Sequence, residues 1–251
     1  MKMGALLGPI LDPSQNDFLA EQARRYEEEG FAGLWMAQAI GRGFMLTDPF
    51  VALSVAAAVT SQVRLGTAVL QLPLYHPADV AHRVLSLLQI SGERLVLGVG
   101  AGSTANDFAT YDRDYSDRFS RFDTCLQELR SYLSTGASGD QSLSPWPDTL
   151  GRTPLYLGSW GKGVERAAGS FDGWIASAAY RTPDEVCDAH ARYRAAGGGH
   201  AVVSTIQISG ETDLGELRDK LARFDEAGFD EAVVMLLPGA PDPADVRRLV
   251  S

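Results

Sequence analysis

Residues 64–102 read RLGTAVLQLPLYHPADVAHRVLSLLQISGERLVLGVGAG, and their pattern of apolar residues indicates the type of fold. This stretch contains an apolar run at Arg64–Leu72, a segment with helical spacing of its apolar residues that begins at Pro77, and a second apolar run at Leu95–Val99. Two such runs flanking an amphipathic helix are typical of buried parallel strands joined by a crossover. We therefore expect the rest of the chain to repeat a strand–helix unit.

The same alternation runs along the whole chain. Strands are predicted at 3–7, 33–37, 64–72, 95–99, 155–157, 173–176, 201–209 and 231–237. Helices are predicted at 15–29, 49–60, from Pro77 onward, 117–134, 164–169, 183–196, 213–227 and 243–249, and the stretches 103–116 and 135–153 are predicted to be loops. Strict alternation at this length predicts one α/β domain over residues 1–251, a closed (β/α)8 TIM barrel. An open, doubly wound sheet is the competing arrangement.

Composition and charge limit the classes of partner. The chain has 251 residues, 45% of them hydrophobic, and a formal net charge of −10, which argues against a nucleic-acid or acidic-membrane partner. The two cysteines form no CxxC motif, and no apolar run approaches the roughly 20 residues that span a bilayer. The start of the sequence, MKMGALLGPI, does not fit a signal peptide. We expect a cytoplasmic protein.

In a (β/α)8 barrel the active site is formed at the C-terminal ends of the strands. The predicted strand ends carry Gly, Ser and Gln but no Asp or Glu, and the sequence shows no His/Asp/Glu cluster. Metal-dependent hydrolysis and paired-carboxylate chemistry are therefore disfavoured, and no metal site is expected. A site with few acid–base groups suits a cofactor that brings its own reactivity.

Two strand ends stand out. The loop GSWGKG, residues 158–163, follows a strand and opens a helix, so its backbone N–H groups, Ser159 and Lys162 favour an anion such as a phosphate. The ordinary alternative is a tight turn that needs glycine for steric reasons. In GTAVLQLP, residues 66–73, the small Thr67 and Ala68 would let a flat ring approach the backbone, with barrel-interior packing as the alternative.

Several motifs in order resemble the bacterial luciferase-like superfamily between about residues 30 and 178. These are VRLGTAVLQLPLYHPADVAHRV, LQISGERLVLGVGAG, NDF, RFSRFD, PLYLGSWGKG and AAGSFDGWIAS. The superfamily comprises flavin-dependent monooxygenases and F420-dependent oxidoreductases on a (β/α)8 barrel.

The resemblance implies roles for individual residues. A bulge with a non-prolyl cis peptide, on which the cofactor ring leans, falls at Thr67-Ala68-Val69, and the phosphate-binding serine falls on Ser159. The end of the fourth strand falls on Gly100-Ala101-Gly102, and Ser177-Ala178 lies at the edge of the ring pocket. The candidate cofactor-binding residues are Gly8, Gln38, Thr67, Ala68, Val69, Gly100, Ala101, Gly102, Gly158, Ser159, Trp160, Gly161, Lys162, Ser177 and Ala178.

The chain also departs from its relatives. Where the luciferase chains have Glu-His-His after the second strand, this sequence reads Gln38-Ala39-Ile40, so the catalytic histidine is absent at Ala39. Ala101 stands where some relatives place a phosphate-holding arginine. Gln38 is the one candidate for a catalytic role, because it can donate and accept hydrogen bonds without proton transfer.

The resemblance implies an oxidoreductase that holds FMN or F420 at the top of the barrel. The preferred expectation is a monooxygenase that uses reduced FMN on a small organic substrate, and the alternatives are F420-dependent hydride transfer, a non-catalytic flavin-binding barrel and a phosphate-ligand barrel without flavin. The expected partners are the small-molecule substrate and a separate flavin or F420 reductase. The resemblance also suggests a homodimer through the helix at 49–60 and the helix beginning at Pro77; the former is apolar nearly all round.

Overall fold

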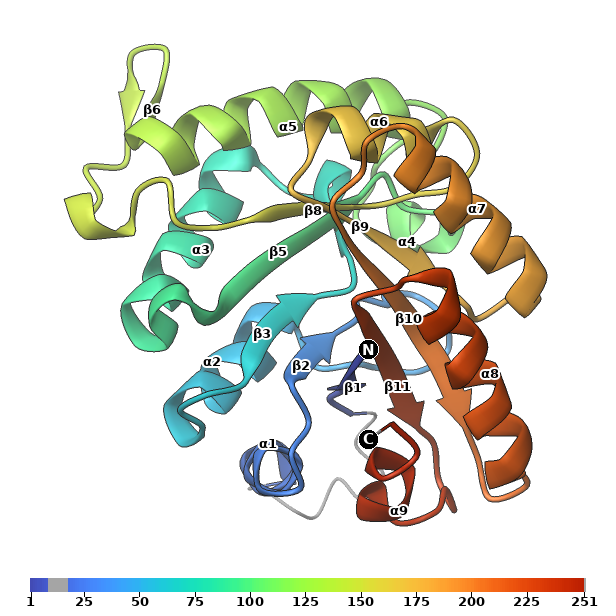
Figure 1. Ribbon diagram of the computed structural model, residues 1–251. Helices are drawn as coiled ribbons and strands as arrows, with labels where there is room; N and C mark the ends of the chain where they lie inside the picture. Colours follow the sequence, from blue (N-terminus) through green and yellow to red (C-terminus); the bar gives the residue numbers. More distant parts are fainter. Residues whose placement is uncertain (9–17, 251) are drawn as a thin grey trace.

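The predicted barrel is confirmed by a computed structural model that describes residues 1–8 and 18–250 (Figure 1). Hydrogen-bonded neighbours around the barrel are parallel throughout, and β3 pairs with both β2 and β5, which closes the sheet. The strands are β1 (Lys2–Leu6), β2 (Gly33–Met36), β3 (Arg64–Thr67), β4 (Leu70–Gln71), β5 (Leu95–Gly100), β8 (Leu155–Gly158), β9 (Gly173–Ser177), β10 (His200–Ile208) and β11 (Glu231–Leu236). The predicted third strand is interrupted, so β3 and β4 are its two halves.

Helices surround the sheet (Figure 1). Asp48 caps α2 through its side chain and His76 caps α3, each directly before a proline at the first helical position. The predicted residues 15–17 of the first helix lie outside the described residues. The helices are α1 (Phe18–Glu28), α2 (Pro49–Val59), α3 (Pro77–Ser91), α5 (Arg118–Thr135), α6 (Gly163–Ser170), α7 (Pro183–Ala195), α8 (Leu214–Ala227) and α9 (Pro243–Arg247).

Two stretches predicted as loops contain short elements. The first, 103–116, holds helix α4 (Ala105–Thr110), and the second, 135–153, holds a hairpin of β6 (Ala137–Ser138) and β7 (Gln141–Ser142) and a 3-10 turn. These elements are shorter than the window over which apolar periodicity is detectable. The prediction was therefore wrong there, and for α4 the error concerns the site directly.

Packing leaves one end of the barrel closed. Leu6, Trp35, Tyr156 and Ile175 belong to the cluster that fills the interior, whereas the neighbouring Met36 packs outward against the helices. At the N-terminal strand ends the buried Glu231 accepts hydrogen bonds from Trp35 Nε1 (2.7 Å) and from Arg64 (3.3 Å). This polar plug fills the bottom of the barrel, so ligands have access at the opposite rim. None of the helices in the described residues is long and apolar enough to cross a bilayer.

Candidate functional site at the C-terminal rim of the barrel

The structure brings the sequence-predicted site residues to one rim. Each lies at or just after the C-terminal end of a barrel strand, or in the break between β3 and β4, and parallel strands put all these ends on the same side. In chain order they lie at or after the ends of β1 (Gly8), β2 (Gln38), β3 (Thr67, Ala68, Val69), β5 (Gly100, Ala101, Gly102), β8 (Gly158, Ser159, Trp160, Gly161, Lys162) and β9 (Ser177, Ala178).

The break between β3 and β4 holds the expected non-prolyl cis peptide, which is Ala68–Val69. Ala68 N–H donates to the Met36 carbonyl of β2 at 2.9 Å. The side chain of Val69 lies over two glycines, because a Cβ built on Gly158 or Gly100 would come within 2.6 Å or 2.9 Å of its methyl carbons. The bulge is therefore supported by neighbouring strands that have no side chains at these positions.

Thr67 is not a ligand-facing residue. It is fully buried, and its hydroxyl donates to the Gly98 carbonyl of β5 at 2.7 Å. The bond ties β3 to β5 directly below the bulge. Thr67 thus supports the site from behind, whereas the sequence had placed it among the cofactor-contacting residues.

The loop after β8 contains an orphaned polar atom. Ser159 Oγ is buried and has no hydrogen-bond partner in the described part of the chain, while the Ser159 carbonyl accepts from Trp174 Nε1 at 3.0 Å. Helix α6 begins at Gly163, where a Cβ would lie 2.7 Å from Ser159 Cβ. The N–H groups of Gly163 and Val164 donate to the Trp160 and Gly161 carbonyls at 3.1 Å and 3.3 Å, so the Ser159 hydroxyl is the unpaired polar group that this loop offers to a phosphate oxygen.

Aromatic and cationic side chains border this loop. Trp160 is partly exposed and meets the buried Trp174 edge-on, with ring centres 6.0 Å apart. The guanidinium of Arg181 lies 5.0 Å from the Trp160 ring centre, and the exposed Lys162 adds a second positive charge. Arg181 is paired with the Glu185 carboxylate at 3.2 Å, so Lys162 is the cation of this border that has no ion-pair partner among the described residues.

Other predicted contacts are partly committed to the fold. The Gly8 N–H donates to Gln22 Oε1 at 2.9 Å, and the Ala178 N–H donates to the Ser204 carbonyl at 2.8 Å. Gly102 has a φ of 84°, and a Cβ there would lie 2.6 Å from Gln71 Oε1. These residues shape the rim, and their backbone N–H groups at Gly8 and Ala178 do not serve a ligand.

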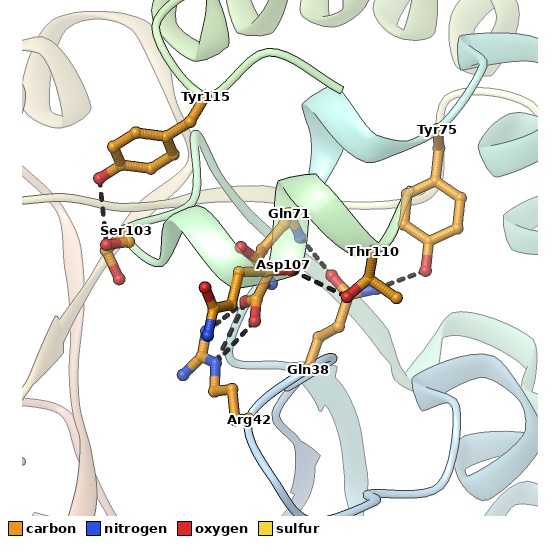
Figure 2. Close-up of polar contacts among 9 residues, drawn as sticks. Gln38, Arg42, Gln71, Tyr75, Ser103, Asp107, Thr110 and Tyr115 are labelled. Atoms are coloured by element: carbon orange, nitrogen blue, oxygen red, sulfur yellow. Dashed lines mark hydrogen bonds and ion pairs between the residues drawn. The ribbon is translucent and has the colours of Figure 1, made fainter. Parts of the chain in front are cut away.

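A chain of polar side chains crosses the rim, as Figure 2 shows. Gln38 Oε1 accepts a hydrogen bond from the Gln71 backbone N–H at 2.8 Å, and Gln38 Nε2 donates to the Tyr75 hydroxyl. Gln71 Nε2 in turn donates to Asp107 Oδ2 at 2.6 Å. The strand ends of β2 and β4 are therefore connected to helix α4 through side-chain amides.

The sequence did not identify Asp107 or Arg42. Asp107 is fully buried and also accepts from Arg42 Nε at 2.9 Å, and these hydrogen bonds raise the pKa of Arg42. The stretch predicted as a polar loop is the helix that presents the carboxylate. The only available signal was the NDF motif, which the resemblance included without a role.

The polar chain offers hydrogen bonds but little proton transfer near neutral pH. Burial raises the pKa of Tyr75, so its phenol keeps its proton. Gln38 and Gln71 do not titrate. Among residues 1–8 and 18–250, no group of three or more His, Cys, Asp or Glu side chains is placed to hold a metal ion.

Comparisons with known proteins show what the chain is similar to. The family model of the luciferase-like monooxygenases matches residues 7–209. The 4-hydroxyprotoasukamycin monooxygenase of Streptomyces nodosus subsp. asukaensis is 30% identical over 152 residues, which are 58% of this chain and 41% of that enzyme. The chain spans less than half the length of this relative, and 31% of the length of an uncharacterized Sinorhizobium fredii protein that is 33% identical over 43% of this chain.

Solved structures share the fold at low sequence identity. An F420-dependent secondary alcohol dehydrogenase in complex with an F420–acetone adduct superposes with a TM-score of 0.76 at 17% identity, over 99% of this chain and 98% of that one. The oxygenating constituent of 3,6-diketocamphane monooxygenase from Pseudomonas putida, in complex with FMN, gives 0.68 at 16% identity, over 100% and 83%. At these identities the likeness concerns the fold alone.

Proposed function

Because the chain belongs to the luciferase-like monooxygenase family, we propose that it is an FMN-dependent monooxygenase acting on a small organic substrate. The observation that carries the proposal is the buried, unpartnered Ser159 hydroxyl at the start of α6, on the same rim as the Ala68–Val69 bulge. Together they offer an anion site and a flat apolar support at the ends of two strands that flank β5.

The residues present fit the cofactor. Ser159 would hold the phosphate, and Ala68 and Val69 would support the ring. When bound, reduced FMN supplies two electrons to dioxygen, one atom of which enters the substrate and the other water. The chain would bind and orient both partners and offer the Gln38 amide as a fixed hydrogen-bonding group.

F420-dependent hydride transfer is the second candidate. It is supported by the exposed Lys162 of the Ser159 loop, whose positive charge would suit the acidic tail that distinguishes F420 from FMN. The F420-dependent dehydrogenase shares the fold as well as the FMN enzyme does. A barrel that binds a flavin without turnover is the third candidate, supported by Ala39 and Ala101 at positions where relatives have His and Arg.

Paired titrations of the apo-protein with FMN and with F420 test the proposal, with cofactor fluorescence and tryptophan quenching as readouts. We expect FMN to bind, and Ser159→Asp to abolish binding, because a carboxylate would occupy the phosphate position. Ser170→Asp is the matched control: it adds the same charge at the other end of α6 and should leave binding unchanged. Binding of F420 alone would favour hydride transfer, and binding of neither would remove the cofactor assignment.

We also propose that two copies pair through the outer face of α2, with a separate reductase supplying the reduced cofactor. Val51 on this helix is 56% exposed, and the helix carries no charged residue. Light scattering at micromolar concentration should give twice the chain mass, with Val51→Lys returning a monomer. A wild-type monomer would contradict the pairing.

A further inference from the structure

A pocket of about 330 Å³ opens beside the polar chain, between the segment 38–49 and Tyr111. Apolar side chains dominate its lining, among them Ile40, Phe44, Leu46 and Pro49. Phe44 is 57% exposed at the rim, whereas Gln38 is 8% exposed at the inner end. The lining is therefore mostly apolar, and Gln38 brings a buried side-chain amide to it beside the polar side chains of Thr47, Asp48 and Tyr111.

The floor of this pocket adjoins the proposed ring site. Gln38 lies two residues beyond Met36, whose carbonyl accepts from Ala68, the first residue of the cis peptide. The Gln38 side-chain oxygen accepts a hydrogen bond from the backbone N–H of Gln71. Gln71 follows Leu70, the first residue of β4 after the bulge. If a molecule bound in the pocket with its polar end at Gln38, that end would therefore lie beside a cofactor ring held at the bulge.

The orientation of the Gln38 amide is determined by its partners. The Gln71 backbone N–H can only donate, so the Gln38 atom facing it is the oxygen. The nitrogen consequently faces the Tyr75 hydroxyl and donates one of its two hydrogens there. No acceptor for the second hydrogen is present among the described residues, and Gln38 is buried. The amide is a locked donor with one unused N–H.

Tyr75 reinforces this assignment. Burial raises the pKa of its phenol, so the hydroxyl does not become a phenolate that would compete for the amide hydrogens. Arg83 lies 5.7 Å from the centre of the Tyr75 ring, and Tyr75 itself is 8% exposed. Tyr75 and Gln71 are positioning residues for Gln38, and Gln38 is the group that touches a ligand.

We propose that this pocket binds the substrate of the rim site and selects an apolar molecule with a carbonyl oxygen, which accepts from the free Gln38 Nε2 hydrogen. The inference rests on the proposed function in taking the ligand to be the substrate. It goes further in naming the substrate class: a neutral ketone, aldehyde or quinone-like molecule. The Gln38 oxygen already accepts one hydrogen bond from Gln71, whereas the second Nε2 hydrogen has no partner among the described residues, so the unmet need of the amide is for an acceptor.

The test compares two probes of one shape, acetophenone and α-methylstyrene, in which C=O is replaced by C=CH₂. Binding to the full chain is measured by ligand-observed saturation-transfer NMR, with and without FMN, and the Gln38 side-chain amide resonance is followed in ¹⁵N-labelled protein. We expect acetophenone to bind at least fivefold more tightly and to shift the Gln38 resonance. The hydrocarbon should leave that resonance in place.

Two variants and one control separate the carbonyl contact from general packing. Gln38→Glu keeps an acceptor for the Gln71 N–H but removes the N–H donors. The ratio of the affinity for acetophenone to that for α-methylstyrene should therefore fall to one or below. Tyr75→Phe keeps the packing of the aromatic ring but removes the hydroxyl that accepts from Gln38 Nε2. The Gln38 amide is then no longer held in place, and the preference for acetophenone should fall severalfold. Tyr180→Phe removes an exposed hydroxyl outside the pocket and should leave the preference unchanged.

Equal binding of both probes to the wild type would overturn the inference, as would an unchanged preference in both Gln38→Glu and Tyr75→Phe. The two variants make the test independent of whether either one folds poorly. The probes need no cofactor, so the result is distinguishable from failure of the proposed function, which is read from the FMN and F420 titrations.

Discussion

Gln71 donates from its side-chain amide to the buried carboxylate of Asp107 at 2.6 Å, so a strand end and a six-residue helix share one polar contact inside the rim. Arg42, from the segment between β2 and α2, binds the same carboxylate. Three separate parts of the chain thus depend on one side chain, and its removal would leave two donors without their partner.

Asp107→Ala is expected to lower the free energy of unfolding by about 3 kcal/mol, because a buried charge-assisted network loses its only shared acceptor. The segment carrying Arg42 should also become a faster site of limited proteolysis. Urea unfolding of the variant and wild type measures the first effect. Asn106→Ala, one residue away on an exposed position, should be near neutral. Equal midpoints for Asp107→Ala and wild type would contradict the role of the carboxylate.

Much of the barrel could be predicted because its signals are local and repeated. Leu95–Val99 and the helix from Pro77 carry long apolar patterns, and the caps at Asp48 and His76 precede prolines. The predicted Ser159 loop lies at the rim for the same reason, since the C-terminal end of a parallel strand places it there.

The remaining part of the site depends on tertiary contacts that no local pattern encodes. Arg42 and Asp107 are 65 residues apart, and their pairing requires α4, a helix too short to show periodicity. The Thr67 hydroxyl bonds to the Gly98 carbonyl of β5 rather than to a ligand, and this contact joins residues that are 31 positions apart in the sequence. The resemblance located the bulge, but the packing of β3 against β5 determines what each residue does there.

Gly163→Ala is expected to weaken binding of the cofactor phosphate about tenfold. A Cβ at this position would lie 3.0 Å from Ser159 Oγ, which would displace the hydroxyl without altering charge. Gly169→Ala is the matched control, because it lies in the same helix and its Cβ would meet nothing within 4 Å. The FMN titration compares the two variants. Identical dissociation constants would show that the position of the Ser159 hydroxyl does not matter for binding.

Gly98→Ala is expected to destabilise the barrel by about 2–3 kcal/mol or to prevent folding. Its Cβ would be placed 2.0 Å from the backbone oxygen of Thr67, and a backbone atom held by a neighbouring strand cannot move away as a side chain can. Gly199→Ala provides the comparison, since its Cβ would meet no atom within 4 Å. Thermal unfolding should place the Gly98 variant well below the Gly199 variant. Similar melting temperatures of the Gly98 and Gly199 variants would mean that the backbone of β3 can shift to accommodate the added Cβ.

Stability should fall on mild acidification because of His190. This histidine is 1% exposed, Arg194 Nε donates to its Nε2 at 3.2 Å, and its ring centre lies 4.2 Å from that of Phe229. Burial, with the nearby Arg194 charge, lowers the pKa of His190 from 6.5 to about 4. The folded state therefore binds its proton less readily than the unfolded state does.

The sign of the pH effect follows directly. The contribution of neutral His190 is fully present above pH 6.5 and is lost as the pH falls from 6.5 toward 4, by roughly 3 kcal/mol in all. His190→Gln can keep the hydrogen bond from Arg194 but cannot titrate, so it should be less stable at pH 7.5 through lost ring packing and lose less on acidification. Urea midpoints between pH 7.5 and 4.5 measure both curves. Parallel curves would assign the acid sensitivity to other groups, with His200, whose pKa burial also lowers, as the next to replace.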